Sequence, residues 1–427
     1  MSTKNRNCRQ ITKRILVEAD LVFVTPVAFA SGDTDEMSDM PLLVDALEDK
    51  PLLTGTTLAG ALRAYLRSVE KGDDLKGAGK LEKKLFGGEK EDDQGSQSLL
   101  IVEDAIGEQS EISYRDGVRI HRASRTAEHK GLYNREVWEV GTTFPIRLEL
   151  PIPEGDQEQD LKNALDVILY GLQSGEIALG ARKNRGYGQI QLKNLRKKEW
   201  DLKKTDLLDW VNTGHNPLPK SSNTQVSLLI VDHRNTLTLQ ATFKVEGSLL
   251  IRSAGKEVDD PDFVYLQHKD GTPIVPGTSL AGVMRHRADK ILRILGYKPE
   301  PESPLITELF GNVSKDSAQA SRLLVREAKV ESIHYTNMVQ ARVSIDRFTG
   351  GALNSALFNE QPVWGGEVTF HFRVSNPKEY EVGLLLLLLK DLWTGDLPIG
   401  GESSIGRGRL KGSQAKLSYH KQSWTLQ

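Results

Sequence analysis

One short stretch of the sequence, Gly180–Gly188, combines glycines with basic side chains in a way that suits contact with phosphate groups. Three glycines there surround Arg182, Lys183 and Arg185, and a β-like run follows at once. Glycine lets the backbone turn through conformations closed to other residues and lets another backbone approach closely. Backbone N–H groups and basic side chains in such a loop favour contact with a nucleic-acid backbone.

The same pattern returns near the C-terminus, in Ile399–Leu410. Its candidate contacts with phosphate groups are Ser403, Ser404, Arg407 and Arg409. Tyr187 in the first stretch fits the start of an RRM signature in which an aromatic ring stacks on a base. Gln189 breaks that signature, and Arg407 replaces Tyr187 in the second stretch. We therefore favour contact with a nucleic-acid backbone over base stacking, and packing of Tyr187 in the core is the alternative.

The two stretches close two halves of a repeated sequence. Gly55–Arg63 returns as Gly277–Arg285, 222 residues later (277 − 55), and Leu85–Gly87 returns as Leu309–Gly311, 224 residues later (309 − 85). Further matches keep the order and nearly the spacing: Leu100–Ala105 with Leu323–Ala328, Val118–Arg122 with Val343–Arg347, and Leu132–Asn134 with Leu357–Asn359. A set of ordered matches at one spacing indicates a tandem duplication.

Each half is expected to contain strands, an early helix and a late helix. β-Branched residues predict a strand over residues 15–30. An apolar stripe at helical spacing predicts a helix from residue 55 to 69, with Leu58, Leu62, Leu66 and Val69 facing the core. The late helices are predicted over residues 160–173 and 380–393. Because strands and helices do not alternate regularly, the pattern favours an α+β fold over a doubly wound sheet.

The length of 427 residues fits two domains. We place the first at residues 1–200, a polar linker at 201–224, and the second at 225–427. The net charge of −2 means that any nucleic-acid surface must come from local clustering of cations. A single cysteine, Cys8, excludes an intramolecular disulfide. The apolar run at Leu384–Leu389 is too short to span a bilayer, the start lacks a signal-peptide core, and a cytoplasmic protein is expected.

Together these motifs resemble a known family. The helix start with Pro276–Gly282, the turn Ile345–Ala352 and the closing glycine-rich loop are similar to those of the repeat-associated mysterious proteins, the RAMP superfamily. The resemblance covers nearly all of both halves. It is strongest to the backbone subunits of type III CRISPR effector complexes, and two fused domains resemble the type III-D fusions.

The resemblance implies two tandem modified RRM or ferredoxin-like domains, each with an inserted β-hairpin thumb. It also implies a subunit that binds guide CRISPR RNA and other effector subunits, with no membrane partner. Its thumbs would kink the duplex of guide and target RNA at about every sixth nucleotide. Its acidic loops would cleave the target RNA, which makes the chain an endoribonuclease within a complex.

Several basic residues are candidate RNA contacts in this context. Arg63, Arg67 and Arg285 lie on the two early helices, beside glycine-rich N-termini that suit anions. The alternative is that these helix arginines pack over their neighbours. The remaining candidates lie in the thumb regions, where a solvated hairpin is the alternative: Arg119, Arg122, Arg125, Lys130 and Arg347.

The catalytic assignment follows from the resemblance. Target-cleaving members carry an Asp before the early helix, and Asp39 holds that place in the first half. The remaining candidates are Asp33 in the first half and Asp259, Asp260 and Asp262 in the second. Asp39 and Asp260 are the expected ligands of Mg²⁺ or another divalent cation, since carboxylates hold such ions beside a scissile phosphate. Solvated or turn-forming aspartates are the alternative.

Two other functions remain open. The chain could be a structural RNA-binding subunit of the same complex with no chemistry of its own. It could also be a stand-alone guide-processing ribonuclease that uses His121 and His129 in acid–base catalysis. Carboxylate loops occur in both halves and the histidines in one, so the cleaving subunit and the structural subunit are favoured.

Overall fold

The computed structural model describes residues 10–30, 41–72, 77–88, 96–108, 111–121, 126–155, 157–204, 206–219, 224–228, 230–255, 259–297, 303–313, 318–420 and 422–427. The chain forms two compact units. Unit 1 comprises Met1–Arg115, Asn134–Lys183 and Tyr187–Arg234. Unit 2 comprises Asp116–Tyr133, Asn184–Gly186 and Asn235–Gln427.

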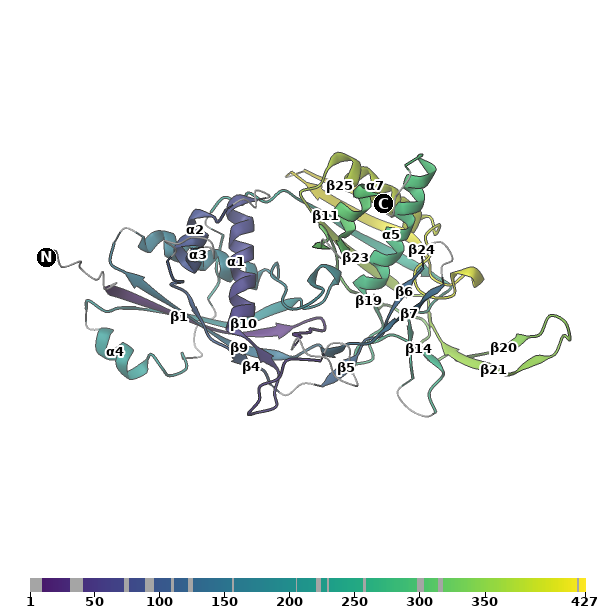
Figure 1. Ribbon diagram of the computed structural model, residues 1–427, viewed down its shortest axis with the longest axis horizontal. Helices are drawn as coiled ribbons and strands as arrows, with labels where there is room; N and C mark the ends of the chain where they lie inside the picture. Colours follow the sequence, from purple (N-terminus) through teal and green to yellow (C-terminus); the bar gives the residue numbers. More distant parts are fainter. Residues whose placement is uncertain are drawn as a thin grey trace. The chain divides into compact units, whose positions relative to one another are not determined.

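Unit 1 is a four-stranded antiparallel sheet with helices on both faces (Figure 1). Its helices are α1 (Gly55–Lys71), α2 (Lys80–Phe86), α3 (Glu158–Gln173) and α4 (Asp206–Thr213). Its strands are β1 (Ile11–Phe23), β2 (Leu52–Leu53), β3 (Ile101–Val102), β4 (Ala105–Ile106), β5 (Ile112–Tyr114), β8 (Glu136–Trp138), β9 (Thr143–Pro153) and β10 (Ile190–Asp201).

The helices of unit 2 are α5 (Gly277–Ile294), α6 (Pro304–Phe310) and α7 (Glu379–Trp393). Its longer strands are β6 (Gly117–Ile120), β7 (Ala127–Tyr133), β11 (Thr236–Glu246), β18 (Leu323–Val325), β19 (Ala328–Glu331), β20 (Gln340–Ile345), β21 (Ala352–Gln361), β23 (Glu367–Ser375), β24 (Arg409–Tyr419) and β25 (Gln422–Leu426). Its short strands are β12 (Ser248–Leu249), β13 (Arg252–Ser253), β14 (Phe263–Tyr265), β15 (Ile274–Val275), β16 (Asn312–Val313), β17 (Ala318–Gln319) and β22 (Val363–Trp364).

Both sheets have the strand order of a ferredoxin-like fold. In unit 1 the order is β10-β1-β9-β3, so the last strand and the one before the late helix flank the first strand. In unit 2 the equivalent order is β24-β11-β23, with β18 and β19 both pairing with β23. This arrangement of β-α-β-β-α-β elements confirms the predicted α+β fold with two ferredoxin-like domains.

The sequence pattern explains why these elements form. In β1 the odd-numbered residues from Ile15 to Phe23 are buried on the helix side of the sheet, as period-2 alternation requires. In α1 the predicted stripe is buried, since Leu58, Leu62, Leu66 and Val69 are each at most 1% exposed. In α7 four of the six consecutive leucines are buried, while Leu386 and Leu387 are 38% and 44% exposed.

Two predicted boundaries differ from the structure. The first strand covers Ile11–Phe23 rather than residues 15–30, because the chain leaves the sheet after Phe23 and Val27 forms only an isolated bridge to Trp138. The segment predicted as a linker contains α4. Trp210 of α4 packs edge-on against Trp200, with ring centroids 5.0 Å apart, so part of this segment covers the sheet of unit 1.

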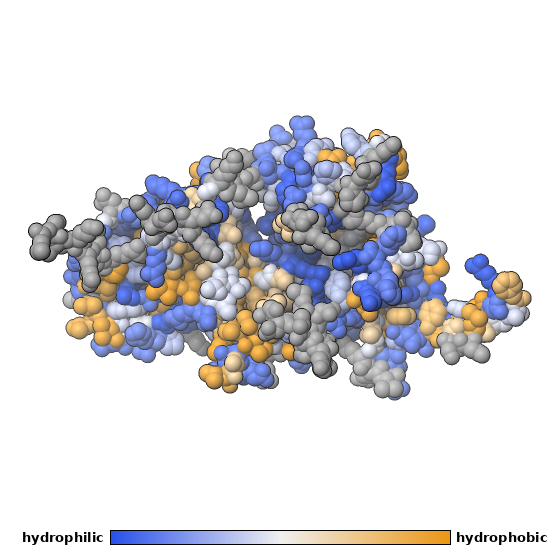
Figure 2. All heavy atoms as spheres, viewed as in Figure 1, coloured by the Kyte–Doolittle hydropathy of each residue, from blue (hydrophilic) through white to orange (hydrophobic). Residues whose placement is uncertain are grey.

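Hairpins occupy the places expected for the thumbs. β6 pairs with β7, and β20 pairs with β21. The β20–β21 hairpin extends well beyond the rest of unit 2 (Figure 1). Apolar side chains are exposed along it (Figure 2). Phe348 at its tip is 100% exposed.

Candidate nucleic-acid interface

The two glycine-rich loops have the same backbone geometry in both units. Gly188 has a φ of 67°, and a Cβ there would lie 1.8 Å from the Leu179 carbonyl oxygen. Gly408 has a φ of 77°, and its Cβ would lie 1.9 Å from the Ile399 carbonyl oxygen. Only glycine fits such a position. The repeat predicted from the sequence is therefore a structural one.

The glycines bring the loop against the chain that leaves the first strand. The N–H of Ala181 donates to the Ala28 carbonyl at 3.0 Å, and the N–H of Gly188 donates to the Pro26 carbonyl at 2.9 Å. In unit 2 the N–H of Gly401 donates to the Leu250 carbonyl at 2.8 Å. These N–H groups hold the loop in place, so phosphate contacts by the loop must come from its other donors and its side chains.

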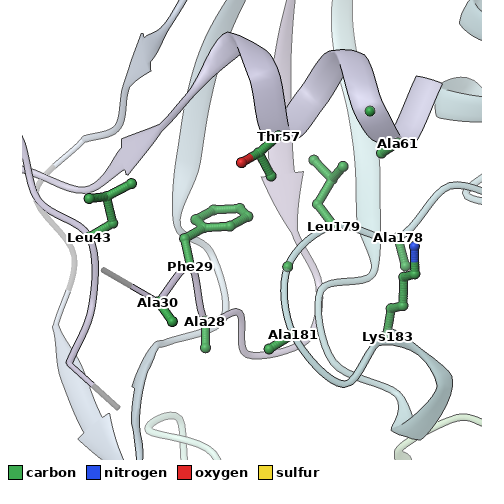
Figure 3. A pocket seen from close by; sticks show the side chains of 12 residues that line it. Ala28, Phe29, Ala30, Leu43, Thr57, Ala61, Ala178, Leu179, Ala181 and Lys183 are labelled. Atoms are coloured by element: carbon green, nitrogen blue, oxygen red, sulfur yellow. The ribbon is translucent and has the colours of Figure 1, made fainter. Parts of the chain in front are cut away.

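In unit 1 the loop and the start of α1 line one hollow of about 300 Å³. Figure 3 shows Thr57 and Ala61 of α1 on one side and Leu179, Ala181 and Lys183 of the loop on the other. Segment 28–30 and Leu43 complete the lining. The structure thus brings together two motifs that lie far apart in the sequence.

A glycine at the hollow is not required by the packing of the protein. Gly60 lines the hollow from within α1, and a Cβ there would have no neighbour within 4 Å. A Cβ at Gly282, the equivalent position in α5, would also have no neighbour within 4 Å. Glycine inside a helix costs about 1 kcal/mol relative to alanine. That cost is present in both halves, and no contact of the described residues explains it.

The N-terminus of α1 is already occupied by groups of the protein. The Thr54 side chain accepts a hydrogen bond from the Thr57 N–H at 3.3 Å. The Asp104 carboxylate accepts one from the Gly55 N–H at 2.6 Å. An anion therefore cannot take these donors, and a ligand would contact the side of the helix along Thr57 and Gly60.

Two predicted RNA contacts on α1 form ion pairs inside unit 1. Glu82 of α2 is fully buried, and its Oε1 accepts a hydrogen bond from the Arg63 Nε at 2.6 Å. The Arg67 guanidinium binds both carboxylate oxygens, at 2.7 and 2.6 Å. Burial alone would raise the pKa of Glu82, but the hydrogen bonds from Arg67 and Arg63 outweigh it and hold the pKa below its usual range. These arginines pack over their neighbours, as in the alternative given with the sequence.

Arg285 on α5 is half-buried at the position equivalent to Arg63. The position equivalent to Glu82 is occupied by Ile306, so unit 2 has an apolar side chain where unit 1 has the carboxylate that binds Arg63. The two halves share the helix and the glycines but differ at this position.

The side chains of the first loop lie in different surroundings. Tyr187 is 6% exposed and belongs to the core of unit 1, which fits the core-packing alternative. Lys183 is exposed at the hollow, and Arg182 is half-exposed with a φ of 55°. Arg185 lies within unit 2, where its guanidinium donates to the carbonyls of Phe310 at 2.8 Å and Leu323 at 3.0 Å.

In the second loop Arg407 and Glu402 belong to a partly buried network of charged side chains. Arg407 is 3% exposed and contacts Glu402 at 3.0 Å and Glu360 at 3.3 Å. Arg252 and Arg342 contact the same two glutamates. Burial, followed by the hydrogen bond and charge of Glu402, raises the pKa of Glu360. Arg407 therefore organises the loop, whereas Ser403, Ser404 and Arg409 are exposed.

The basic residues of the two hairpins differ in what the structure describes. Arg119 is 76% exposed and lies 3.7 Å from Glu128, and Lys130 and His121 are exposed. Arg122 and Arg125 lie outside the described residues. In the second hairpin Arg347 is exposed beside Asp346, whose carboxylate accepts hydrogen bonds from the Phe348 N–H and the Thr349 hydroxyl, both at 2.9 Å.

The acidic residues of unit 2 lie on an exposed segment that leads into β14. Asp259, Asp260 and Asp262 are exposed, and Asp262 accepts a hydrogen bond from the Asn359 N–H at 2.8 Å. Asp33 and Asp39 fall outside the described residues. Within the ranges that are described, no group of three or more His, Cys, Asp or Glu side chains is placed to hold a metal ion.

Sequence reasoning missed Glu82, Gly60 and Phe348. Glu82 belongs to the short, highly charged helix Lys80–Phe86, and nothing in that pattern distinguishes a buried carboxylate from a solvated one. Gly60 and Gly282 were visible as part of the repeated helix start. An unexplained helix glycine found in both halves was the signal that could have identified the hollow.

A comparison of the sequence with protein-family profiles finds the same division into two similar halves. The family profile described as the RAMP superfamily matches residues 20–191 and 242–411, one match in each half of the chain. No curated protein has a matching sequence. No helix among the described residues is long and apolar enough to cross a membrane.

Proposed function

The chain belongs to the RAMP superfamily and is thereby a CRISPR-associated RNA-binding protein, and we propose that it is a backbone subunit of a type III effector complex that holds the guide RNA at both glycine-rich loops. The observation that carries this proposal is the hollow of unit 1. There a helix glycine with no packing role faces a loop that bears Lys183.

The chemistry of the hollow suits a sugar–phosphate backbone better than a base. Its lining is made mainly of glycine and alanine, with the Thr57 hydroxyl and the Lys183 ammonium as the polar groups. Small residues allow close approach, a hydroxyl can bind a phosphate oxygen, and an ammonium group neutralises charge. With Tyr187 buried in the core, the loop offers backbone contact rather than stacking.

Binding of a labelled single-stranded guide RNA to the full chain tests this proposal. Gly60→Ala adds one methyl group to the hollow, and we expect weaker RNA binding with a helix that is more stable by about 1 kcal/mol. Lys183→Glu should weaken binding and make it less dependent on salt. Lys193→Glu, the same charge change at an exposed lysine on β10, is the matched control. Equal affinities for all variants would contradict the proposal.

We further propose that the acidic segments support cleavage of target RNA. The observation favouring this activity is that the Asn359 N–H anchors Asp262 while Asp259 and Asp260 stay exposed beside it. Mg²⁺ needs only one or two carboxylates from the protein, with water and phosphate oxygens completing its shell, and oxygen ligands of this kind fit it. Asp260 in unit 2 and Asp39 in unit 1 would hold the ion, which would polarise the scissile phosphate.

Cleavage of a matched target by the assembled complex, with and without Mg²⁺, tests this second proposal. Asp39→Ala and the triple change at Asp259, Asp260 and Asp262 should each remove one product while RNA binding stays intact. Asp270→Ala, at another exposed aspartate of unit 2, should leave the products unchanged. If both acidic variants give the products of the unchanged chain, the catalytic assignment is wrong and the subunit is structural. Metal-independent cutting of free repeat RNA that is lost in His121→Ala would instead identify a guide-processing ribonuclease.

A further inference from the structure

The face of the unit 2 sheet that points away from α5 and α7 carries a basic hollow of about 290 Å³. It is lined from four strands and the turn after β18. Its polar lining residues are Thr238, Gln240, Arg326, His371, Arg373, Lys416 and Ser418. None of the residues that line it is acidic.

The equivalent face of unit 1 shows what is different. Glu18 and Gln240 occupy equivalent positions of the two first strands. Glu18 pairs with Arg147 and Arg196, and Gln240 pairs with the residues at the equivalent positions of its own two neighbouring strands. In unit 1 the Glu18 carboxylate lies between two cations, 2.9 Å from Arg147 and 3.4 Å from Arg196. The sheet of unit 1 therefore contains its own anion.

In unit 2 the flanking positions again carry basic residue types, but an amide, that of Gln240, replaces the Glu18 carboxylate. Gln240 is paired with His371 on β23 and with Lys416 on β24, the positions of Arg147 and Arg196. A second acidic residue of unit 1 is replaced by a basic one, since Arg373 occupies the position of Glu149. Desolvation, followed by the positive charge of Arg326, lowers the pKa of His371. The Lys416 ammonium beside Gln240 is exposed and can bind an anion supplied from outside.

The two faces also differ in what covers them. In unit 1 the chain after β10 folds back over the sheet, where the Leu218 N–H donates to Glu18 at 2.8 Å and Arg147 donates to the Gly214 carbonyl. In unit 2 the chain after β24 forms β25, which pairs along the edge of the sheet instead. The hollow of unit 2 is therefore left open by the described part of the chain.

We propose that this face of unit 2, which we call the basic sheet face, binds the phosphate backbone of single-stranded RNA. The Lys416 ammonium suits a phosphate oxygen, and the hydroxyl and amide groups of Thr238, Ser418 and Gln240 suit phosphate and ribose. An acidic protein segment fits less well, because protein interfaces centre on exposed apolar anchors, and the apolar lining residues Leu239, Leu324 and Phe372 are at most 8% exposed. This inference does not rest on the proposed role of the unit 1 hollow.

Gln240→Glu is the direct test, because it restores the carboxylate that unit 1 carries at the same position of its first strand. Binding of a labelled single-stranded oligoribonucleotide to the full chain would be measured over a range of salt concentrations. We expect weaker binding for Gln240→Glu. For Lys416→Glu we expect a slope of log affinity against log salt that is shallower by about 0.7, the value of one lost phosphate contact on a single strand.

One control variant and one further measurement complete the test. Lys290→Glu makes the same charge change as Lys416→Glu on α5, on the helical side of the sheet, and should leave both affinity and slope unchanged. NMR titration of His371 should show its pKa rising when RNA is added. The proposal is overturned if Gln240→Glu and Lys416→Glu bind RNA as Lys290→Glu does, even if the face then proves to bind an acidic protein. In that case, if Gly60→Ala still weakens RNA binding, the proposed RNA contact at the unit 1 hollow is supported even though the one at the basic sheet face is wrong.

Discussion

At the scale of single residues, Glu82 decides what two basic side chains can do. Its carboxylate is fully buried and receives hydrogen bonds from Arg63, Arg67 and the Gly79 N–H. A buried carboxylate is costly unless its hydrogen-bonding capacity is filled, so the arginines are needed where they are. Their guanidinium groups serve the packing of α1 against α2 before they serve any ligand.

Glu82→Gln should destabilise unit 1 by about 3 kcal/mol, because it leaves two cations facing a neutral amide at a buried position. The measurement is the midpoint of chemical denaturation. Glu48→Gln, at an exposed ion pair with Lys50, is the matched control and should change stability by less than about 1 kcal/mol. Equal effects of the two changes would show that the Glu82 cluster adds nothing to stability.

Acid should weaken unit 1 through the same residue. The pKa of Glu82 is lowered in the folded state, so its contribution is present above its ordinary value of 4.5 and is lost as the pH falls through the lowered folded value. Between neutral and acidic pH, the unchanged chain should therefore lose more stability than Glu82→Gln. Denaturation curves at both pH values check this, and parallel losses would contradict it.

At the scale of elements, one glycine in each closing loop has the tightest backbone contact of that loop. A Cβ at Gly188 would lie 1.8 Å from the Leu179 carbonyl oxygen at a positive φ. Gly188→Ala should therefore cost more than about 1 kcal/mol. Gly408→Ala should cost a similar amount, as its Cβ would lie 1.9 Å from the Ile399 carbonyl oxygen. Thermal unfolding tests both variants, and an unchanged melting temperature in either would mean that its loop can adopt another conformation.

The second hairpin presents one aromatic side chain. Asp346 fixes the turn, and Phe348 at the tip is 100% exposed, so its ring has no packing role in unit 2. Apolar side chains of this kind can part stacked bases. Phe348→Ala should abolish the local unstacking that a fluorescent base reports in a bound guide–target duplex, while Phe348→Trp should retain it. Stability should change by less than about 0.5 kcal/mol in both. Unstacking that persists in Phe348→Ala would assign it to another part of the hairpin.

The sequence predicted the elements better than the site. Periodicity located α1 and α7 within two residues of their ends, since a helical apolar stripe is a local property. The roles of Arg63 and Arg407 were not predictable, because Glu82 lies in the next helix and Glu360, one of the two carboxylates at Arg407, lies in β21. Tyr187 shows the same limit: its motif was read locally, whereas its burial depends on the whole core.

At the scale of the whole chain, the duplication has kept a scaffold and changed its charges. Strand order, loop glycines and the helix glycines at 60 and 282 are shared. In contrast, Glu18 is replaced by Gln240, and Arg182 is replaced by Glu402 at the same positive-φ position. Two copies of one fold therefore offer different surfaces, and we expect them to bind RNA with different strengths.

The most direct test of the central claim is ultraviolet crosslinking of the full chain to its co-purified RNA, followed by mass spectrometry of the crosslinked peptides. If the glycine-rich loops and the early helices hold the guide, crosslinks will fall at residues 57–61 and 178–183 in unit 1. They will also fall at the equivalent residues 279–283 and 398–403 in unit 2. Bound RNA that crosslinks strongly elsewhere and at none of these segments would contradict the account.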